Sequence, residues 1–121
     1  MTNSYDKSSL SSLPKKTLTI RNRFGYTVCM IKSFKHKGLE LFFKTGNTSK
    51  IQIKHKQKLR HILFMLDNAV ELTELNLPSF RLHRLQGKRF EFYSIKVSGN
   101  WRITFKFFDS NAEIVNYEDY H

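Results

Sequence analysis

The sequence FEFYSIKVSGNWRITFKFFDSNAEIVNY, residues 90–117, decides the fold that we expect. It contains three runs rich in aromatic and β-branched residues, the composition typical of β-strands. Two polar turns separate the runs: Ser98-Gly99-Asn100 is typical of a tight hairpin, and Asp109-Ser110-Asn111 reverses the chain again. Three strands joined by short turns predict an antiparallel meander, with strands at 90–97, 101–108 and 112–117.

Upstream of the meander we expect two helices and two further strands. A strand at 30–34 precedes a short helix at 39–43, which the turn residues at 45–47 end. A longer helix is predicted at 50–70, and residues 80–85 alternate between apolar and polar side chains as a strand does. The apolar stripe of the longer helix is formed by Leu59, Ile62, Leu63 and Leu66. Helices need a sheet face to bury against, so we predict an α+β fold with two N-terminal helices packed on a twisted antiparallel sheet.

The chain is long enough for one domain with one modest core, at 121 residues. Its regular pattern begins at Met30, whereas residues 1–29 are polar, basic and rich in Ser and Thr. We therefore interpret 1–29 as a flexible N-terminal extension and 30–121 as the folded domain. The single cysteine, Cys29, excludes an internal disulfide framework and a multi-cysteine zinc site, and it fits a cytoplasmic protein. No apolar run approaches the roughly 18 residues that a membrane-spanning helix needs.

The charge of the chain indicates a polyanionic partner. Lys and Arg number 21 against 10 Asp and Glu, for a net charge of +11. Such a surface attracts nucleic acid by releasing its counterions, so nucleic acid or a ribonucleoprotein is favoured over an anionic membrane or an acidic protein. Residues 109–121, in contrast, contain four acidic residues and no Lys or Arg. The simplest interpretation of that end is a last strand whose acidic side chains point into solvent.

His83 and the last three residues, Asp119-Tyr120-His121, offer acid–base chemistry near neutral pH. Cleavage of RNA without a metal needs a base for the 2′-hydroxyl, an acid for the departing 5′-oxygen and cations for the phosphate. Arg89 and Arg102 can supply the positive charge. A metal site formed by His83, Asp119 and His121 is an alternative, although their spacing matches no familiar ligand motif. Residue types and spacing alone predict a basic α+β domain that binds RNA.

Five segments of the chain occur together, in this order, in one known family. They are MIKSFKHKGL (30–39), NLP (76–78), FRLH (80–83), GNWRITF (99–105) and NYEDYH (116–121). They resemble the HigB toxins, also called plasmid-maintenance killer proteins, of the RelE/ParE superfamily. The resemblance covers 30–121 and implies a compact RelE-like microbial RNase fold. It further implies a metal-independent endoribonuclease without cofactors, which cleaves mRNA in the ribosomal A site and is neutralised by a helix-turn-helix antitoxin of the HigA kind.

The resemblance also implies roles for individual residues. The family's catalytic group is matched by His83, Asp119, Tyr120 and His121. Its phosphate-holding arginine is matched by Arg102. The chain departs from the family at Gln86, where many relatives have a lysine that faces RNA, and at Phe92-Tyr93, where the usual pair is Tyr-Trp. Lys88 or Arg84 can replace the missing lysine.

Two other functions stay open on the sequence. A gyrase poison of the ParE type has the same fold, but those relatives lack the acid–base set that His83 and the Asp-Tyr-His end provide. A non-catalytic relative that binds RNA or the ribosome is the second alternative, because Gln86 removes one expected phosphate contact.

Overall fold

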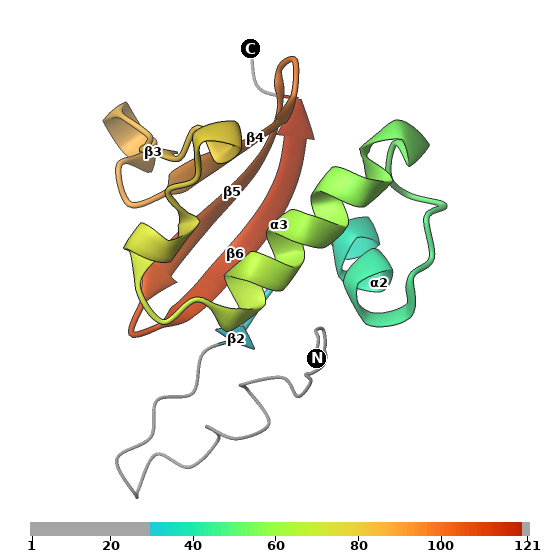
Figure 1. Cartoon of the computed structure of the whole chain (residues 1–121), viewed down its shortest axis with the longest axis horizontal. Coiled ribbons are helices and arrows are strands. Elements are labelled where there is room, and N and C mark those ends of the chain that lie inside the picture. Colours follow the sequence, from blue (N-terminus) through green and yellow to red (C-terminus); the bar gives the residue numbers. More distant parts are fainter. Residues whose placement is uncertain (1–29, 120–121) are drawn as a thin grey trace, which may run out of the picture.

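The computed structural model describes residues 30–119. The predicted N-terminal extension (1–29) and the predicted catalytic residues Tyr120 and His121 lie outside the described residues. Five strands form one sheet, and helix α3 (Lys56–Asn68) crosses one of its faces with α2 (Lys37–Thr45) beside it (Figure 1). Within 30–119, no helix is long and apolar enough to cross a membrane.

The sheet has the strand order β2-β6-β5-β4-β3. Its strands are β2 (Met30–Ile31), β3 (His83–Arg84), β4 (Tyr93–Ser98), β5 (Trp101–Phe108) and β6 (Asn111–Asp119). The predicted meander is confirmed, since β4, β5 and β6 pair antiparallel through the two expected turns. The α+β class is confirmed as well, but the sheet is mixed because β2 pairs parallel to β6. No hairpin turn fixes the direction of β2, which joins the free edge of the last strand.

The two helices form close to the predicted places. Helix α2 (Lys37–Thr45) starts where the Nδ1 atom of His36 accepts a hydrogen bond from the Leu39 N–H group at 2.9 Å, and it ends at Gly46 in the left-handed conformation. Helix α3 (Lys56–Asn68) starts six residues later than predicted, because a short 3₁₀ turn at Ile53–His55 precedes it. The predicted stripe at 59, 62, 63 and 66 is buried, at no more than 2% exposure.

The core lies between the helices and the sheet. Its largest fully buried side chains are Leu39, Leu59, Ile62, Leu63, Leu66, Leu75, Phe80, Ile95, Ile103, Phe105 and Val115. Burying each such side chain contributes about 1.5–3 kcal/mol relative to an exposed one.

The predicted strand at 80–85 is mostly wrong. Phe80 ends a 3₁₀ turn (Pro78–Phe80), Arg81 adopts the left-handed conformation with φ of 48°, and only His83–Arg84 pair with β4. Phe80 and Leu85 are both buried, although a continuous strand would direct them to opposite faces. The turn at Arg81 removes that conflict, and it leaves His83 on a two-residue edge strand.

Candidate active site

Three of the predicted site residues, His83, Arg89 and Arg102, lie on one face of the sheet. The core side chains Ile95, Ile103 and Tyr117 point toward α3, so their neighbours on each strand point to the opposite side, here called the outer face. The register aligns a row of His83, Ser94, Thr104 and Asn116 across this face, and a second row of Lys96, Arg102 and Glu118. His83 therefore shares the outer face with Arg102.

Arg89 spans the outer face from the loop before β4. It lies in a 3₁₀ turn, η4 (Gly87–Arg89), and its Nη2 atom donates to Glu118 Oε2 at 2.6 Å while Nη1 donates to Oε1 at 3.2 Å. The hydroxyl of Thr104 donates to Glu118 Oε2 at 2.6 Å and accepts from Arg89 Nη2 at 3.3 Å. This bidentate pair connects the η4 loop to the last strand.

Glu118 is ionised within this arrangement. Burial alone would raise the pKa of its carboxyl, but the hydrogen bonds from Arg89 and Thr104 and the positive charge of Arg89 outweigh burial, so the pKa is lowered. Any anion that binds Arg89 must compete with this carboxylate. We expected the acidic side chains at this end to point into solvent, and for Glu118 that expectation is wrong, because its side chain is only 23% exposed.

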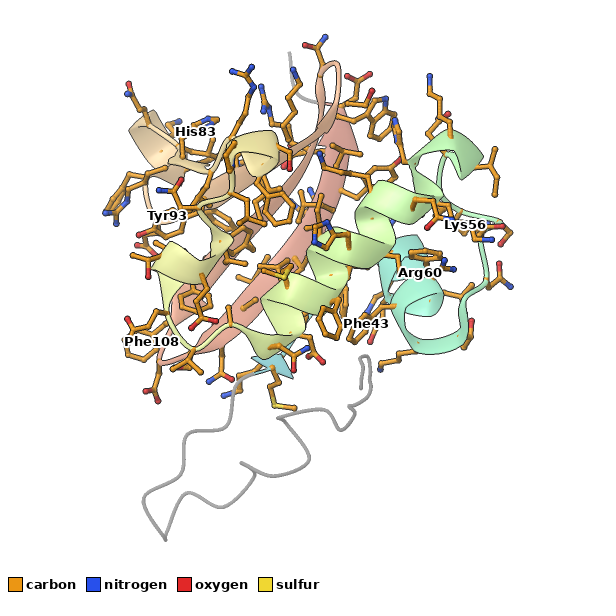
Figure 2. The ribbon with its side chains drawn as sticks, in the orientation of Figure 1. Phe43, Lys56, Arg60, His83, Tyr93 and Phe108 are labelled. Atoms are coloured by element: carbon orange, nitrogen blue, oxygen red, sulfur yellow. The ribbon has the colours of Figure 1, made fainter. Side chains whose placement is uncertain are left out.

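His83 lies at the edge of the sheet with its side chain exposed, as Figure 2 shows. Its Nδ1 atom is 3.1 Å from the carbonyl oxygen of Arg81, an acceptor. That contact suits a proton on Nδ1 and leaves Nε2 able to accept a proton. The left-handed residue Arg81 thus orients the imidazole.

Asp119 does not lie beside His83. It pairs in register with Trp101, whose ring packs on Tyr117, so strand alternation directs Asp119 to the face that carries α3. Strands β4 and β5 separate β3 from β6, a distance of about 14 Å at the usual spacing of strands. The structure therefore brings His83, Arg89 and Arg102 to one face, and it places Asp119 at the end of β6 on the other.

The alternative metal site gains no support from this placement. His83 and Asp119, two of its three proposed ligands, point to opposite faces, and His121 is outside the described residues. Among residues 30–119, no group of three His, Cys, Asp or Glu side chains is placed to hold a metal ion.

A basic hollow of about 680 Å³ lies next to the outer face at the β6 edge. It is lined by Lys35, His36, Lys37, Gly38, Leu41, Lys50 and Asn116. Asn116 also donates to Glu118 at 3.4 Å, so it borders both the hollow and the Arg89 ion pair. The three lysines extend the positive potential of the site past the edge of the sheet.

Comparison with known proteins identifies the fold's family. A model described as "RelE-like toxin of type II toxin-antitoxin system HigB" matches residues 32–121. The chain belongs to this HigB-like toxin family. The Endoribonuclease HigB of Proteus vulgaris is 49% identical over 92 residues, which are 76% of this chain and all of that protein. The predicted resemblance is thus confirmed, and this HigB-like toxin has an antitoxin as its partner.

The sequence alone did not reveal two buried residues near the site, His55 and Tyr117. His55 is 3% exposed, although the predicted apolar stripe of this helix did not include it. A signal was available: His55 precedes Leu59 by four residues, so it continues the apolar stripe of α3 backward by one turn.

Proposed function

We propose that this HigB-like toxin is a metal-independent endoribonuclease that cleaves translated mRNA in the ribosomal A site and thereby arrests growth. The observation that carries the proposal is the outer face, where the exposed imidazole of His83 shares a surface with Arg89 and Arg102. The name of the Proteus vulgaris relative supports the same activity. The matched range 32–121 includes all six predicted site residues.

The chemistry divides among these residues as follows. One histidine, His83 or His121, takes the proton of the 2′-hydroxyl, whose oxygen attacks the phosphorus and displaces the 5′-oxygen; the other protonates that leaving oxygen. Arg102 and Arg89 hold the phosphate and stabilise the charge that develops on it. Asp119 orients a histidine, and Tyr120 stacks on a base.

The distance between the two ends of the site favours a large partner. His83 and Asp119 lie on different faces and three strand spacings apart, so a flexible RNA strand is poorly positioned between them. A ribosome that fixes the mRNA supplies the missing orientation, a factor of large effect in catalysis. The basic hollow at Lys35, Lys37 and Lys50 offers phosphate contacts beyond the cleaved nucleotide. The proposed partners are the ribosome, its mRNA and a HigA-like helix-turn-helix antitoxin, and the proposed location is the cytoplasm, where translation occurs.

Cleavage assays on ribosomes test the proposal. The full chain is incubated with naked mRNA, with ribosomes programmed by the same mRNA, and with supercoiled DNA plus gyrase, and breaks are mapped by primer extension and gel electrophoresis. We expect cleavage of ribosome-bound mRNA, little cleavage of naked RNA and no DNA breaks. Equal rates with and without ribosomes would contradict the ribosome dependence, and gyrase-dependent DNA breaks would favour the ParE-like alternative.

A pair of variants tests the outer face. Arg102→Gln removes one positive charge beside the row of His83, and we expect about a 10²-fold loss of cleavage rate. Arg60→Gln is the matched control, because it removes the same charge from α3, where Arg60 packs over the Phe42 ring at 5.8 Å on the helical side of the molecule (Figure 2). Equal losses in the two variants would indicate a general effect of charge rather than a site.

A further inference from the structure

An aromatic cluster, here called the Tyr117 cluster, lies at the end of β6. It consists of the buried residues His55 and Tyr117 and the half-buried residues His36 and Trp101. Tyr117 is 4% exposed, and its ring contacts all three others, with centroid distances of 4.6 Å to Trp101, 5.5 Å to His36 and 5.9 Å to His55. His36 caps the start of α2, and His55 immediately precedes α3. The cluster therefore joins the starts of both helices to the last strand.

A short hydrogen bond links two members of the cluster. The Tyr117 hydroxyl oxygen lies 2.6 Å from His55 Nδ1 and accepts a hydrogen bond from the Gln52 N–H group at 3.3 Å. The hydroxyl that accepts from Gln52 still has its own proton to donate, so we assign that proton to the bond with Nδ1 and the proton of the neutral imidazole to Nε2. Burial, reinforced by the charge of Lys54, lowers the pKa of His55, and burial raises the pKa of Tyr117, so both groups are held neutral as this assignment requires.

Burying a histidine at position 55 is energetically less favourable than burying an apolar side chain there. The Nε2 atom of His55 is buried and has no hydrogen-bond partner within residues 30–119. An unsatisfied buried donor costs about as much as the hydrogen bond that Nδ1 makes, and an apolar residue at position 55 would avoid that cost. Core stability therefore does not explain why a histidine occupies this position, whereas a requirement for an acceptor opposite the Tyr117 hydroxyl does.

The geometry points to a positioning role. Tyr117 precedes Asp119 by two residues on the same strand and shares its face, and Trp101, which stacks on Tyr117, is the strand partner of Asp119. We propose that the Tyr117–His55 hydrogen bond fixes the direction of the end of β6, and so holds Asp119, the last residue of that strand, in the orientation that cleavage requires. This role rests on the proposed nuclease function. Tyr117 and His55 act through Asp119, so they are positioning residues and not catalytic ones.

Substitutions that remove only the hydrogen bond test the role in the full chain. Tyr117→Phe keeps the ring and removes the hydroxyl, and we expect the single-turnover rate on programmed ribosomes to fall about 10–100-fold with KM within about twofold. His55→Leu should lower the rate by the same factor. The double variant, with both substitutions, should be only slightly slower than either, because the two groups form one unit. His55→Asn offers a carbonyl oxygen near the position of Nδ1 and should recover most of the rate.

A matched control separates positioning from stability. Ile103→Val removes one buried methylene group at the β5 position opposite Tyr117, and it should lower the melting temperature as much as Tyr117→Phe does, by about 4–8 °C. Its cleavage rate should stay within twofold of wild type. A Tyr117→Phe chain that cleaves at the wild-type rate, or an equal rate loss in Ile103→Val, would overturn the positioning role.

Cleavage by the wild-type chain distinguishes a failure of the proposed nuclease function from a failure of the positioning role. If wild type leaves ribosome-bound mRNA intact, the proposed nuclease function fails, and the positioning role fails with it. If wild type cleaves and Tyr117→Phe does too, only the positioning role fails. Imidazole ¹⁵N spectra give a readout without activity: we expect His55 Nδ1 to appear as an unprotonated acceptor, and a proton on Nδ1 would overturn the assigned hydrogen bond.

Discussion

Removal of the Arg89–Glu118 ion pair should destabilise the domain by an amount that its geometry sets. The two contacts of 2.6 and 3.2 Å are bidentate and charge-assisted, a type of hydrogen bond worth about 1.5–3 kcal/mol when buried. The side chains are 38% and 23% exposed, so water screens part of that energy, and fully exposed pairs give only about 0.2–1 kcal/mol. We therefore expect a coupling energy of about 1 kcal/mol.

A double-mutant cycle measures this coupling. Arg89→Gln, Glu118→Gln and the double variant are unfolded in urea, with the fluorescence of Trp101, the single tryptophan, as the probe. Glu40 and Lys44 on α2 provide a matched control cycle, because their 2.9 Å pair has side chains 63% (Lys) and 30% (Glu) exposed; this pair should couple more weakly than Arg89–Glu118. A coupling for Arg89–Glu118 no larger than that of the control would refute the idea that this pair holds the η4 loop across the sheet.

The pH dependence of the coupling is a second test of the same pair. The folded-state pKa of Glu118 lies below the ordinary carboxyl value of 4.5, so the stabilisation is present above that value and is lost as the pH falls through the folded pKa. The coupling should therefore persist at pH 6 and decline in acid. A coupling that stayed constant down to pH 2 would show that the charge of Glu118 is not its source.

Three further predictions concern the fold. Phe80→Ala empties a fully buried position and should cost about 3–5 kcal/mol in urea unfolding, whereas Phe108→Ala, 75% exposed, should cost less than about 0.5; similar costs would contradict the described core. Burial lowers the folded-state pKa of His36 and His55 below 6.5, so the unfolded chain binds protons first and melting temperatures should fall as the pH drops below about 6.5; rising values would reverse the assigned direction. A chain that begins at Met30 should fold and cleave like the full chain, because 1–29 lie outside the family match; failure of that shortened chain to fold would make the N-terminal residues structural.

The local pattern of the sequence is enough to predict the central part of the fold. Strands β4 to β6 and the buried stripe of α3 depend on alternation, helical spacing and turn residues, all of which lie close together in the chain. The parallel pairing of β2 with β6 depends on residues about eighty positions apart. There Ile114, with φ of 54°, forms an irregularity whose N–H group donates to Ser33 Oγ at 2.8 Å, and no local pattern indicates it.

For the site, too, the sequence predicts the residue types but not where their side chains lie. The residue types that cleave RNA are visible in the sequence, and the resemblance to HigB toxins selects among them. Their placement is not visible, because the face of each side chain depends on strand register. The left-handed turn at Arg81 puts His83 on an edge strand, and the register of β5 with β6 directs Asp119 to the opposite face. The pairing of Arg89 with Glu118 likewise follows from the return of the η4 loop over the sheet.

The most direct test of the proposed catalytic group is single-turnover cleavage of ribosome-bound mRNA by two variants, each of which lacks one of the two histidines. One variant ends after Tyr120 and so lacks His121, and the other is His83→Ala. Each should lose roughly 10²–10⁴-fold in rate, the usual contribution of one positioned acid or base, with an unchanged melting temperature. The double variant should lose little more, because the two histidines serve one reaction. A chain without His121 that cleaves within about twofold of wild type would contradict the role of the C-terminal residue and leave His83 as the remaining histidine.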